Sequence, residues 1–98
     1  MKKVALVTGA SAGIGFATAS LLADNGYVVY GAARRMEKME PLVSAGVKTA
    51  PMDLADDRSI VSVVEKIIRE QGHIDVLINN AGFGAYGAVE DVPKWPLH

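Results

Sequence analysis

The chain has 98 residues, of which 50% are hydrophobic and 21% are charged, a composition typical of one folded domain and not of a disordered chain. Ten basic residues are balanced by eleven acidic ones without a basic stripe, so we expect neither nucleic acid nor an anionic membrane surface as a partner. Cysteine is absent and histidine occurs twice, which argues against a metal centre and is consistent with a reducing, cytoplasmic location.

The apolar run at the amino terminus is too short for a secretory signal peptide. Lys2 and Lys3 precede an apolar run that ends after four residues at Thr8, whereas a signal peptide needs about 7 to 15. No segment approaches the roughly 18 consecutive apolar residues of a membrane span. We therefore expect neither secretion nor membrane insertion.

The first elements in chain order are a strand and a helix. Residues 4–7 form a continuous apolar, β-branched run, which predicts a central strand buried on both faces. A glycine-rich segment follows this strand. Beyond it, a stripe of apolar residues with the helical spacing i, i+3, i+7 and i+8 predicts a helix that ends at Asn25 and Gly26. The residues of this stripe are Ile14, Ala17, Leu21 and Leu22.

The next segments repeat the alternation. Residues 27–32 predict a second strand and 36–45 a weaker helix, which Pro41 interrupts unless it opens the helix. Residues 47–52 predict a third strand, although Pro51 cannot donate a ladder hydrogen bond.

The clearest helix follows the third strand. Asp56 or Asp57 can cap its amino end, and Gln71-Gly72 ends it. Residues 76–78 then predict a fourth strand of the buried type. The helix carries an apolar stripe made of Ile60, Val63, Val64, Ile67 and Ile68.

Strands that alternate with helices predict an α/β fold with a parallel sheet covered on both faces. Right-handed crossovers make it a doubly wound, Rossmann-type sheet of four strands in the order 3-2-1-4. We expect residues 1–82 to form this half-domain and residues 83–98, which contain glycines and prolines without a sustained period, to form an irregular tail.

A glycine-rich segment lies between the first strand and the first helix. Gly9, Gly13 and Gly15 lack side chains, so the backbone amides here can approach a pyrophosphate, and the helix dipole favours the anion. The alternative is a tight turn without a ligand. The spacing is neither the G-x-G-x-x-G fingerprint nor a Walker loop.

Thr8-Gly9-Ala10-Ser11-Ala12-Gly13-Ile14-Gly15 resembles the cofactor-loop motif Thr-Gly-x-x-x-Gly-x-Gly of the short-chain dehydrogenase/reductase family. Asn79-Asn80-Ala81-Gly82 matches the family's Asn-Asn-Ala-Gly motif, and Asp53-Leu54 matches its adenine-contacting pair. The resemblance runs from about residue 2 to about residue 93 and implies a nicotinamide dinucleotide cofactor. The residues expected to bind it are Gly9, Ser11, Gly13, Ile14, Gly15, Arg34, Arg35, Asp53, Leu54, Asn80, Ala81 and Gly82.

The later motifs also fit the predicted topology. Ligands of open α/β sheets bind beyond the carboxyl ends of the strands, at the switch in strand order, and Asp53 and Asn79 both end predicted strands there. Asn79 and Asn80 could instead serve mainly to satisfy neighbouring backbone groups. The resemblance implies that Asn79 helps to hold the central sheet.

The residues after the second strand bear on the type of cofactor. An acid there would bind a ribose 2′-hydroxyl, whereas an arginine accommodates a 2′-phosphate. The chain has Arg34 and Arg35 and no acid before Glu37, which favours NADP(H) over NAD(H), with Arg34 preferred and Ser11 as a further hydroxyl donor. The alternative is two solvated surface arginines.

The family's catalytic Ser and Tyr-x-x-x-Lys residues have no counterparts in this chain. Four residues after Tyr27, Tyr30 and Tyr86 stand Gly31, Arg34 and Glu90. We therefore predict no catalytic residue and a chain that is catalytically incompetent on its own, which suggests a truncated, frame-shifted or engineered end, or a partner chain that supplies the active site.

The fourth strand would form an apolar edge without charge or proline if it ends the sheet. We expect two copies to pair there as a homodimer around a two-fold axis. His73, just before this strand, is expected to be a surface loop residue. The competing hypothesis for the whole chain is a noncatalytic nucleotide-binding or self-associating scaffold.

Overall fold

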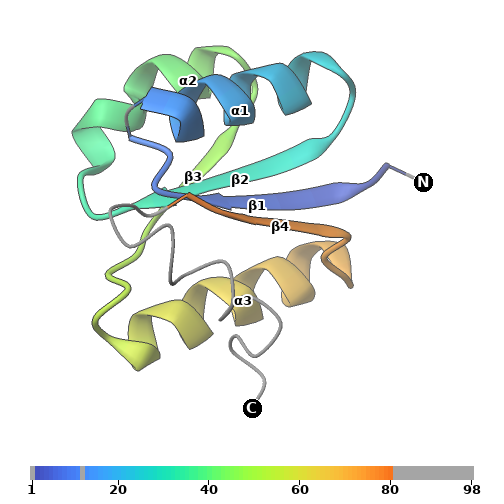
Figure 1. Cartoon of the computed structure of the whole chain (residues 1–98). Coiled ribbons are helices and arrows are strands. Elements are labelled where there is room, and N and C mark those ends of the chain that lie inside the picture. The colour runs from blue at the N-terminus through green and yellow to red at the C-terminus, as the bar shows by residue number, and fades with distance from the viewer. Residues whose placement is uncertain (1, 12, 81–98) are drawn as a thin grey trace.

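A computed structural model describes residues 2–11 and 13–80, so the predicted tail, Ala81 and Gly82 lie outside the described residues. A parallel sheet forms the middle layer, with α1 and α2 on one face and α3 on the other (Figure 1). The elements are β1 Val4–Thr8, α1 Gly13–Asp24, β2 Val28–Ala33, the 3₁₀ helix η1 Met36–Met39, α2 Glu40–Ser44, β3 Lys48–Pro51, α3 Asp57–Gln71 and β4 Val76–Asn79.

The strands have the order β3-β2-β1-β4, and all three pairings are parallel. Val4 pairs with Val28 of β2, and Ala5 pairs with Val76 of β4. Every residue of β1 is buried, as expected for a central strand with helices on both faces. The predicted α/β fold with strand order 3-2-1-4 is confirmed.

Alternate residues of β1 pack into two cores, because successive side chains of a strand point to opposite faces. Leu6 packs with Tyr30 of β2 and with Ile67 of α3 in one core. Val7 packs in the other core with Val29 and with Leu42 of α2. Each helix layer therefore has its own apolar contact with the sheet.

Helix α3 follows its sequence pattern closely. The Asp56 carboxylate caps it by accepting a hydrogen bond from the Arg58 amide at 3.0 Å, and Gly72 ends it with a φ of 87° that favours glycine. Of the predicted stripe, Ile60, Val63 and Ile67 are buried, Val64 is half-buried, and Ile68 is exposed.

Helix α1 forms where the pattern predicts, but of the apolar stripe inferred for it only Leu22 packs against the core, whereas Ala17 is exposed. Ile14 and Leu21 are 76% and 62% exposed, and the buried residues are Gly15 and Ala19. Small residues face the sheet because α1 lies close to the loop and strands beneath it. A helix that is apolar on most sides does not reveal its inner face by periodicity.

The weak helix predicted for residues 36–45 is two short helices. The 3₁₀ helix η1 ends at Met39, and Pro41 occupies the first turn of α2, where the missing amide costs no hydrogen bond. Pro51 is the last residue of β3 and pairs with Ala33. The ladder resumes at Met52, whose amide donates to the Ala33 carbonyl at 3.0 Å.

Strand β4 differs from its predicted burial. All four of its residues are only half-buried, although three of them are apolar. The physical reason is position: within the described residues, β4 pairs with β1 alone and lies at the edge of the sheet.

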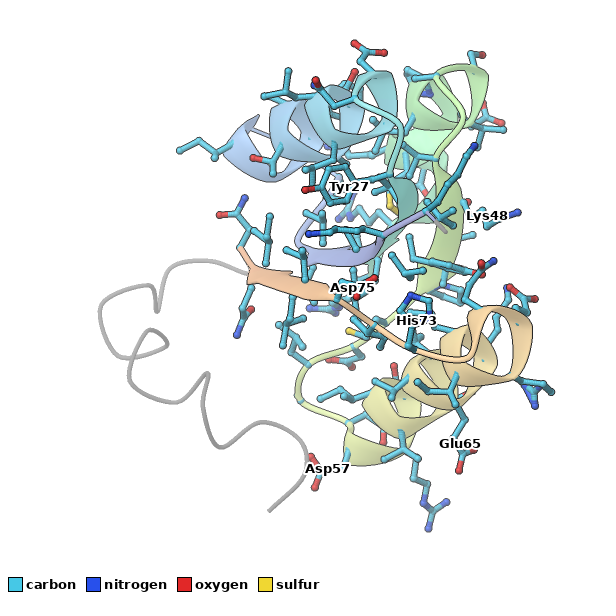
Figure 2. All side chains as sticks on the ribbon, turned by 90° about the vertical axis from the view of Figure 1, so that its right-hand side faces the viewer. Tyr27, Lys48, Asp57, Glu65, His73 and Asp75 are labelled. Atoms are coloured by element: carbon cyan, nitrogen blue, oxygen red, sulfur yellow. The ribbon has the colours of Figure 1, made fainter. Side chains whose placement is uncertain are left out.

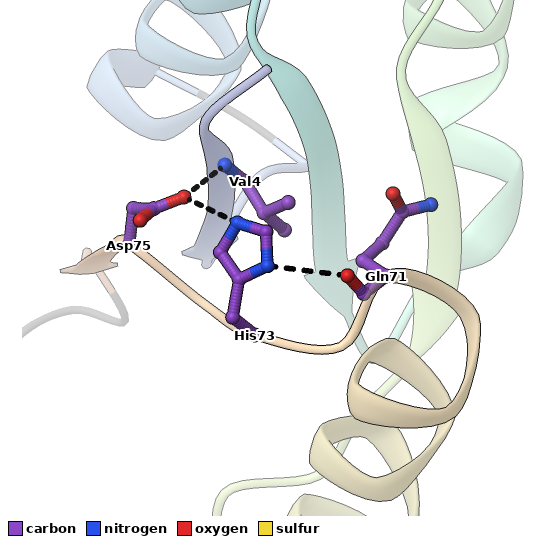
Figure 3. A network of polar contacts seen from close by, with 4 residues as sticks. All are labelled: Val4, Gln71, His73 and Asp75. Atoms are coloured by element: carbon purple, nitrogen blue, oxygen red, sulfur yellow. Dashed lines mark hydrogen bonds and ion pairs between the residues drawn. The ribbon is translucent and has the colours of Figure 1, made fainter. Parts of the chain in front are cut away.

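A polar network joins β4, β1 and α3 at the amino ends of the strands, the side that faces the viewer in Figure 2. The Asp75 carboxylate accepts from the Val4 amide at 2.7 Å and contacts His73 Nε2 at 2.9 Å (Figure 3). His73 Nδ1 lies 3.1 Å from the Gln71 carbonyl. His73 is thus half-buried and connects the end of α3 with the residue that precedes β4, a role that its sequence neighbours did not indicate.

None of the helices in the described part of the chain has both the length and the apolar character needed to cross a membrane.

Candidate functional site

The glycine-rich segment forms a compact turn at the carboxyl end of β1. The chain turns at Gly9 with a φ of 65°, and α1 begins at Gly13 with a φ of 59°, both in the left-handed region that glycine tolerates. The Ala10 amide donates to the Ala32 carbonyl at 3.2 Å, which ties the turn to β2. Ser11 is half-buried in this turn and Ile14 is exposed beside it. The predicted strand-turn-helix context of the motif is therefore present.

Gly15 brings α1 against the turn more closely than any other residue type could. A Cβ atom at this position would lie 2.2 Å from the Gly9 carbonyl oxygen and 3.0 Å from Asn80 Nδ2. Because the first neighbour is backbone, no side-chain rotation could relieve the contact. The helix amino terminus is thus held directly behind the turn, where its dipole favours an anion.

A buried hydroxyl joins the carboxyl ends of β1 and β4. Thr8 is 2% exposed, and its Oγ1 donates to Asn79 Oδ1 at 2.8 Å while it accepts from the Asn80 amide at 3.1 Å. Asn79 therefore has the sheet-holding role that the resemblance implies. Asn80 Nδ2 is buried without a hydrogen-bond partner among the described residues, and it lies next to the first turn of α1.

A pocket of about 500 Å³ opens where β2 and β3 end. Arg34, the first residue after β2, and Asp53, two residues after β3, both line it. These residues are 19 positions apart in sequence, and both line the pocket because β2 and β3 are neighbouring parallel strands. The lining consists of Arg34, Pro51, Met52, Asp53, Ser59 and Ser62.

The other predicted site residues near this pocket have different surroundings. Arg35 is the exposed residue that precedes η1, and Leu54 is 37% exposed. The two serines from α3 were not predicted, although their spacing of three residues places them on one helical face. Only the packing of α3 across the end of β3 shows that this face borders the pocket.

The described residues contain no group of three or more His, Asp or Glu side chains that could hold a metal ion. The chemistry that the arrangement supports is that of a polar, phosphate-bearing ligand. Arg34 and Asp53 line the pocket at the ends of β2 and β3, while the glycine turn and the amino terminus of α1, whose backbone amides favour an anion, lie at the end of β1 on the same edge of the sheet.

Comparison with known proteins decides the family. Residues 3–95 match the sequence profile of the short chain dehydrogenases. The chain belongs to the short-chain dehydrogenase/reductase family. It is 44% identical over 89 residues to a 3-ketodihydrosphingosine reductase of Bacteroides thetaiotaomicron, an alignment that covers 90% of this chain and 31% of the relative.

Solved structures of family members agree with the fold. A short-chain dehydrogenase from Streptomyces avermitilis superposes with a TM-score of 0.80 at 40% identity, covering 84% of this chain and 31% of that one. A metagenomic short-chain oxidoreductase in complex with NADP superposes with a TM-score of 0.75 at 38% identity, covering 83% and 39%. The chain thus spans about a third of the length of these family members.

Proposed function

We propose that this chain is the NADP(H)-binding portion of a short-chain dehydrogenase/reductase, whose members transfer a hydride between the cofactor and a carbonyl or alcohol substrate. The observation that carries the proposal is the pocket in which Arg34 meets Asp53, on the same edge of the sheet as the glycine turn. The NADP complex of the metagenomic relative supports the same type of cofactor.

Each part of the site has a distinct task in this proposal. The backbone amides of the turn from Gly9 to Gly13 and the α1 terminus hold the pyrophosphate. The Arg34 guanidinium pairs with the 2′-phosphate, and the Asp53 carboxylate accepts from the adenine amine. The bound cofactor supplies the hydride, and this chain supplies its binding and orientation.

The direct test is titration with NADPH, followed by the fluorescence of the reduced nicotinamide. We expect saturable binding, with NADPH bound more tightly than NADH because Arg34 offers a charge-assisted contact only to the 2′-phosphate. Arg34→Ala should weaken NADPH binding by about 10- to 100-fold, the equivalent of one charged hydrogen-bonding partner, and leave NADH binding nearly unchanged.

A matched control is Arg69→Ala, which removes an exposed arginine near the carboxyl end of α3. It should bind NADPH as the wild type does. If the wild-type chain shows no saturable binding at millimolar NADPH, the proposed function is wrong and the glycine turn serves only the fold.

We further propose that the chain alone binds the cofactor without turning it over, because no tyrosine in the sequence is followed at the fourth position by lysine. A purified preparation should therefore not oxidise NADPH in the presence of ketone substrates. Turnover that appears only when a second protein is added would show that a partner supplies the active site.

Self-association is the second proposal, and the half-buried apolar residues of β4 favour it. Two copies that pair β4 with β4 around a two-fold axis would cover this edge in both. Sedimentation should then show a dimer, and Leu77→Lys should shift it to a monomer. A stable monomer of the wild type at high micromolar concentration would contradict the proposal.

A further inference from the structure

The Asp53 backbone is held on both sides within the loop that leads from β3 to α3. Its amide donates to Ser59 Oγ at 2.8 Å, and its carbonyl accepts from the Asp56 amide at 2.9 Å. The Asp53 carboxylate oxygen Oδ1 also accepts from the Ala55 amide at 2.9 Å. The other carboxylate oxygen makes no contact of this kind within the described residues, and it belongs to a residue that lines the pocket.

The Ser59 bond differs from the other two because it reaches out of the loop. The bonds to Ala55 and Asp56 are local, whereas Ser59 lies in the first turn of α3, which is anchored in the core through Ile60 and Val63. The hydroxyl therefore connects Asp53 to a rigid element. Ser59 is itself half-buried and lines the same pocket.

We propose that Ser59 is a positioning residue for base recognition: it fixes the Asp53 backbone so that the free carboxylate oxygen accepts a hydrogen bond from the exocyclic amine of adenine. This inference rests on the proposed cofactor function and adds a residue to it. Without the Ser59 oxygen, the Asp53 amide loses its partner, and Asp53 itself keeps only its hydrogen bonds to Ala55 and Asp56 within the loop. The carboxylate then keeps its bond to the Ala55 amide but loses the direct bond that fixes Asp53 to the first turn of α3.

A role through Asp53 can be separated from a general effect on the fold by changing the ligand. The hypoxanthine analogue of NADPH carries a carbonyl oxygen where adenine carries the amine, so it offers Asp53 an acceptor in place of a donor. The measured quantity is the ratio of the dissociation constants of the hypoxanthine and adenine dinucleotides, each followed by nicotinamide fluorescence. A change that only loosens the fold weakens both ligands equally and leaves this ratio unchanged.

Wild-type protein should prefer the adenine dinucleotide by about tenfold, as expected for one well-placed hydrogen bond to a charged group. Ser59→Ala should reduce this ratio by about three- to tenfold, and Ser59→Thr, which keeps the hydroxyl, should restore it. Ser44→Ala is the matched control, because Ser44 is an exposed serine at the carboxyl end of α2 and does not line the pocket; its ratio should equal that of the wild type. Ser59→Cys serves as a second variant if Ser59→Ala does not fold, since a thiol is a weak acceptor.

Asp53→Ala should abolish the preference, and adding Ser59→Ala to it should change the ratio no further, because the serine acts through the aspartate. An unchanged ratio in Ser59→Ala, or a wild type that binds both dinucleotides equally, would overturn the positioning role while the proposed cofactor function stands. Absence of binding to either dinucleotide by the wild type would overturn the proposed function itself, and this inference with it.

Discussion

Replacing Gly15 by alanine sets two opposing effects against each other. Alanine favours helix over glycine by about 1 kcal/mol in a helix interior, so propensity alone predicts a more stable α1. The added Cβ, however, would lie 2.2 Å from the Gly9 carbonyl oxygen and 2.9 Å from the Gly9 carbonyl carbon. These contacts can be relieved only by moving α1 away from the turn.

The size of the stability loss depends on the fact that the backbone of α1, and not a side chain, must move. Overpacking typically costs about 1 to 3 kcal/mol, and a clash with backbone belongs at the upper end because no rotamer change can absorb it. With the propensity gain subtracted, we expect Gly15→Ala to lower the free energy of unfolding by about 2 kcal/mol. For a domain of this size, such a loss lowers the melting temperature by roughly 8 to 16 °C.

Thermal and urea unfolding followed by circular dichroism measure this change. Ala17→Gly, at an exposed position of the same helix, is the control for propensity and should cost about 1 kcal/mol. NADPH titration of Gly15→Ala should also show weaker binding, since the turn and the α1 terminus are displaced together. A Gly15→Ala protein that is as stable as the wild type would refute the close packing of α1 on the turn.

Two further predictions concern buried hydroxyls. Thr8→Val keeps the shape of a side chain that is 2% exposed but removes its hydrogen bonds to Asn79 and Asn80. It should lower the free energy of unfolding, measured in urea, by about 2 kcal/mol. Thr8→Ser keeps the hydroxyl and should lower it less, so equal unfolding midpoints for the two variants would contradict a stabilising role of the hydroxyl. Burial, and then the hydrogen bond to the Glu70 carboxylate, raise the pKa of Tyr30 above its ordinary value of 10.0. The folded state therefore keeps this proton longer than the unfolded state, and the stability that Tyr30 contributes below pH 10 is lost as the pH rises through the raised pKa. The stability advantage of the wild type over Tyr30→Phe, measured by urea unfolding, should therefore narrow as the pH rises above about 10. An advantage independent of pH would be inconsistent with the raised pKa.

Strand β1, helix α3 and the glycine turn could be predicted from local patterns, because for each of them a single short segment contains the whole signal. The apolar run of β1 requires burial on both faces, and the stripe and caps of α3 require a helix between Asp56 and Gly72. The glycine pattern before α1 likewise indicated a tight strand-to-helix turn. These predictions held because the residues that decide them are neighbours in the chain.

Other features depended on which segments of the chain pack against each other. The inner face of α1 could not be inferred from its apolar residues, because several faces were apolar. The close approach of α1 to the turn selects Gly15, and its packing on the core selects Ala19. The half-burial of β4 follows from its place at the sheet edge. His73 lies in the loop between α3 and β4, as expected, but only the structure shows that it is half-buried between the Asp75 carboxylate and the Gln71 carbonyl.

The sequence by itself determined the order of the elements, the parallel sheet and the glycine turn, since hydrophobic period and backbone freedom are local properties. The tertiary structure alone decided that Arg34 and Asp53 share a pocket and that Ser59 holds the Asp53 amide. It also decided that Thr8 bonds to residues more than 70 positions away. Such contacts arise from the pairing of β1, β2, β3 and β4 side by side, which brings distant carboxyl ends to one edge of the sheet.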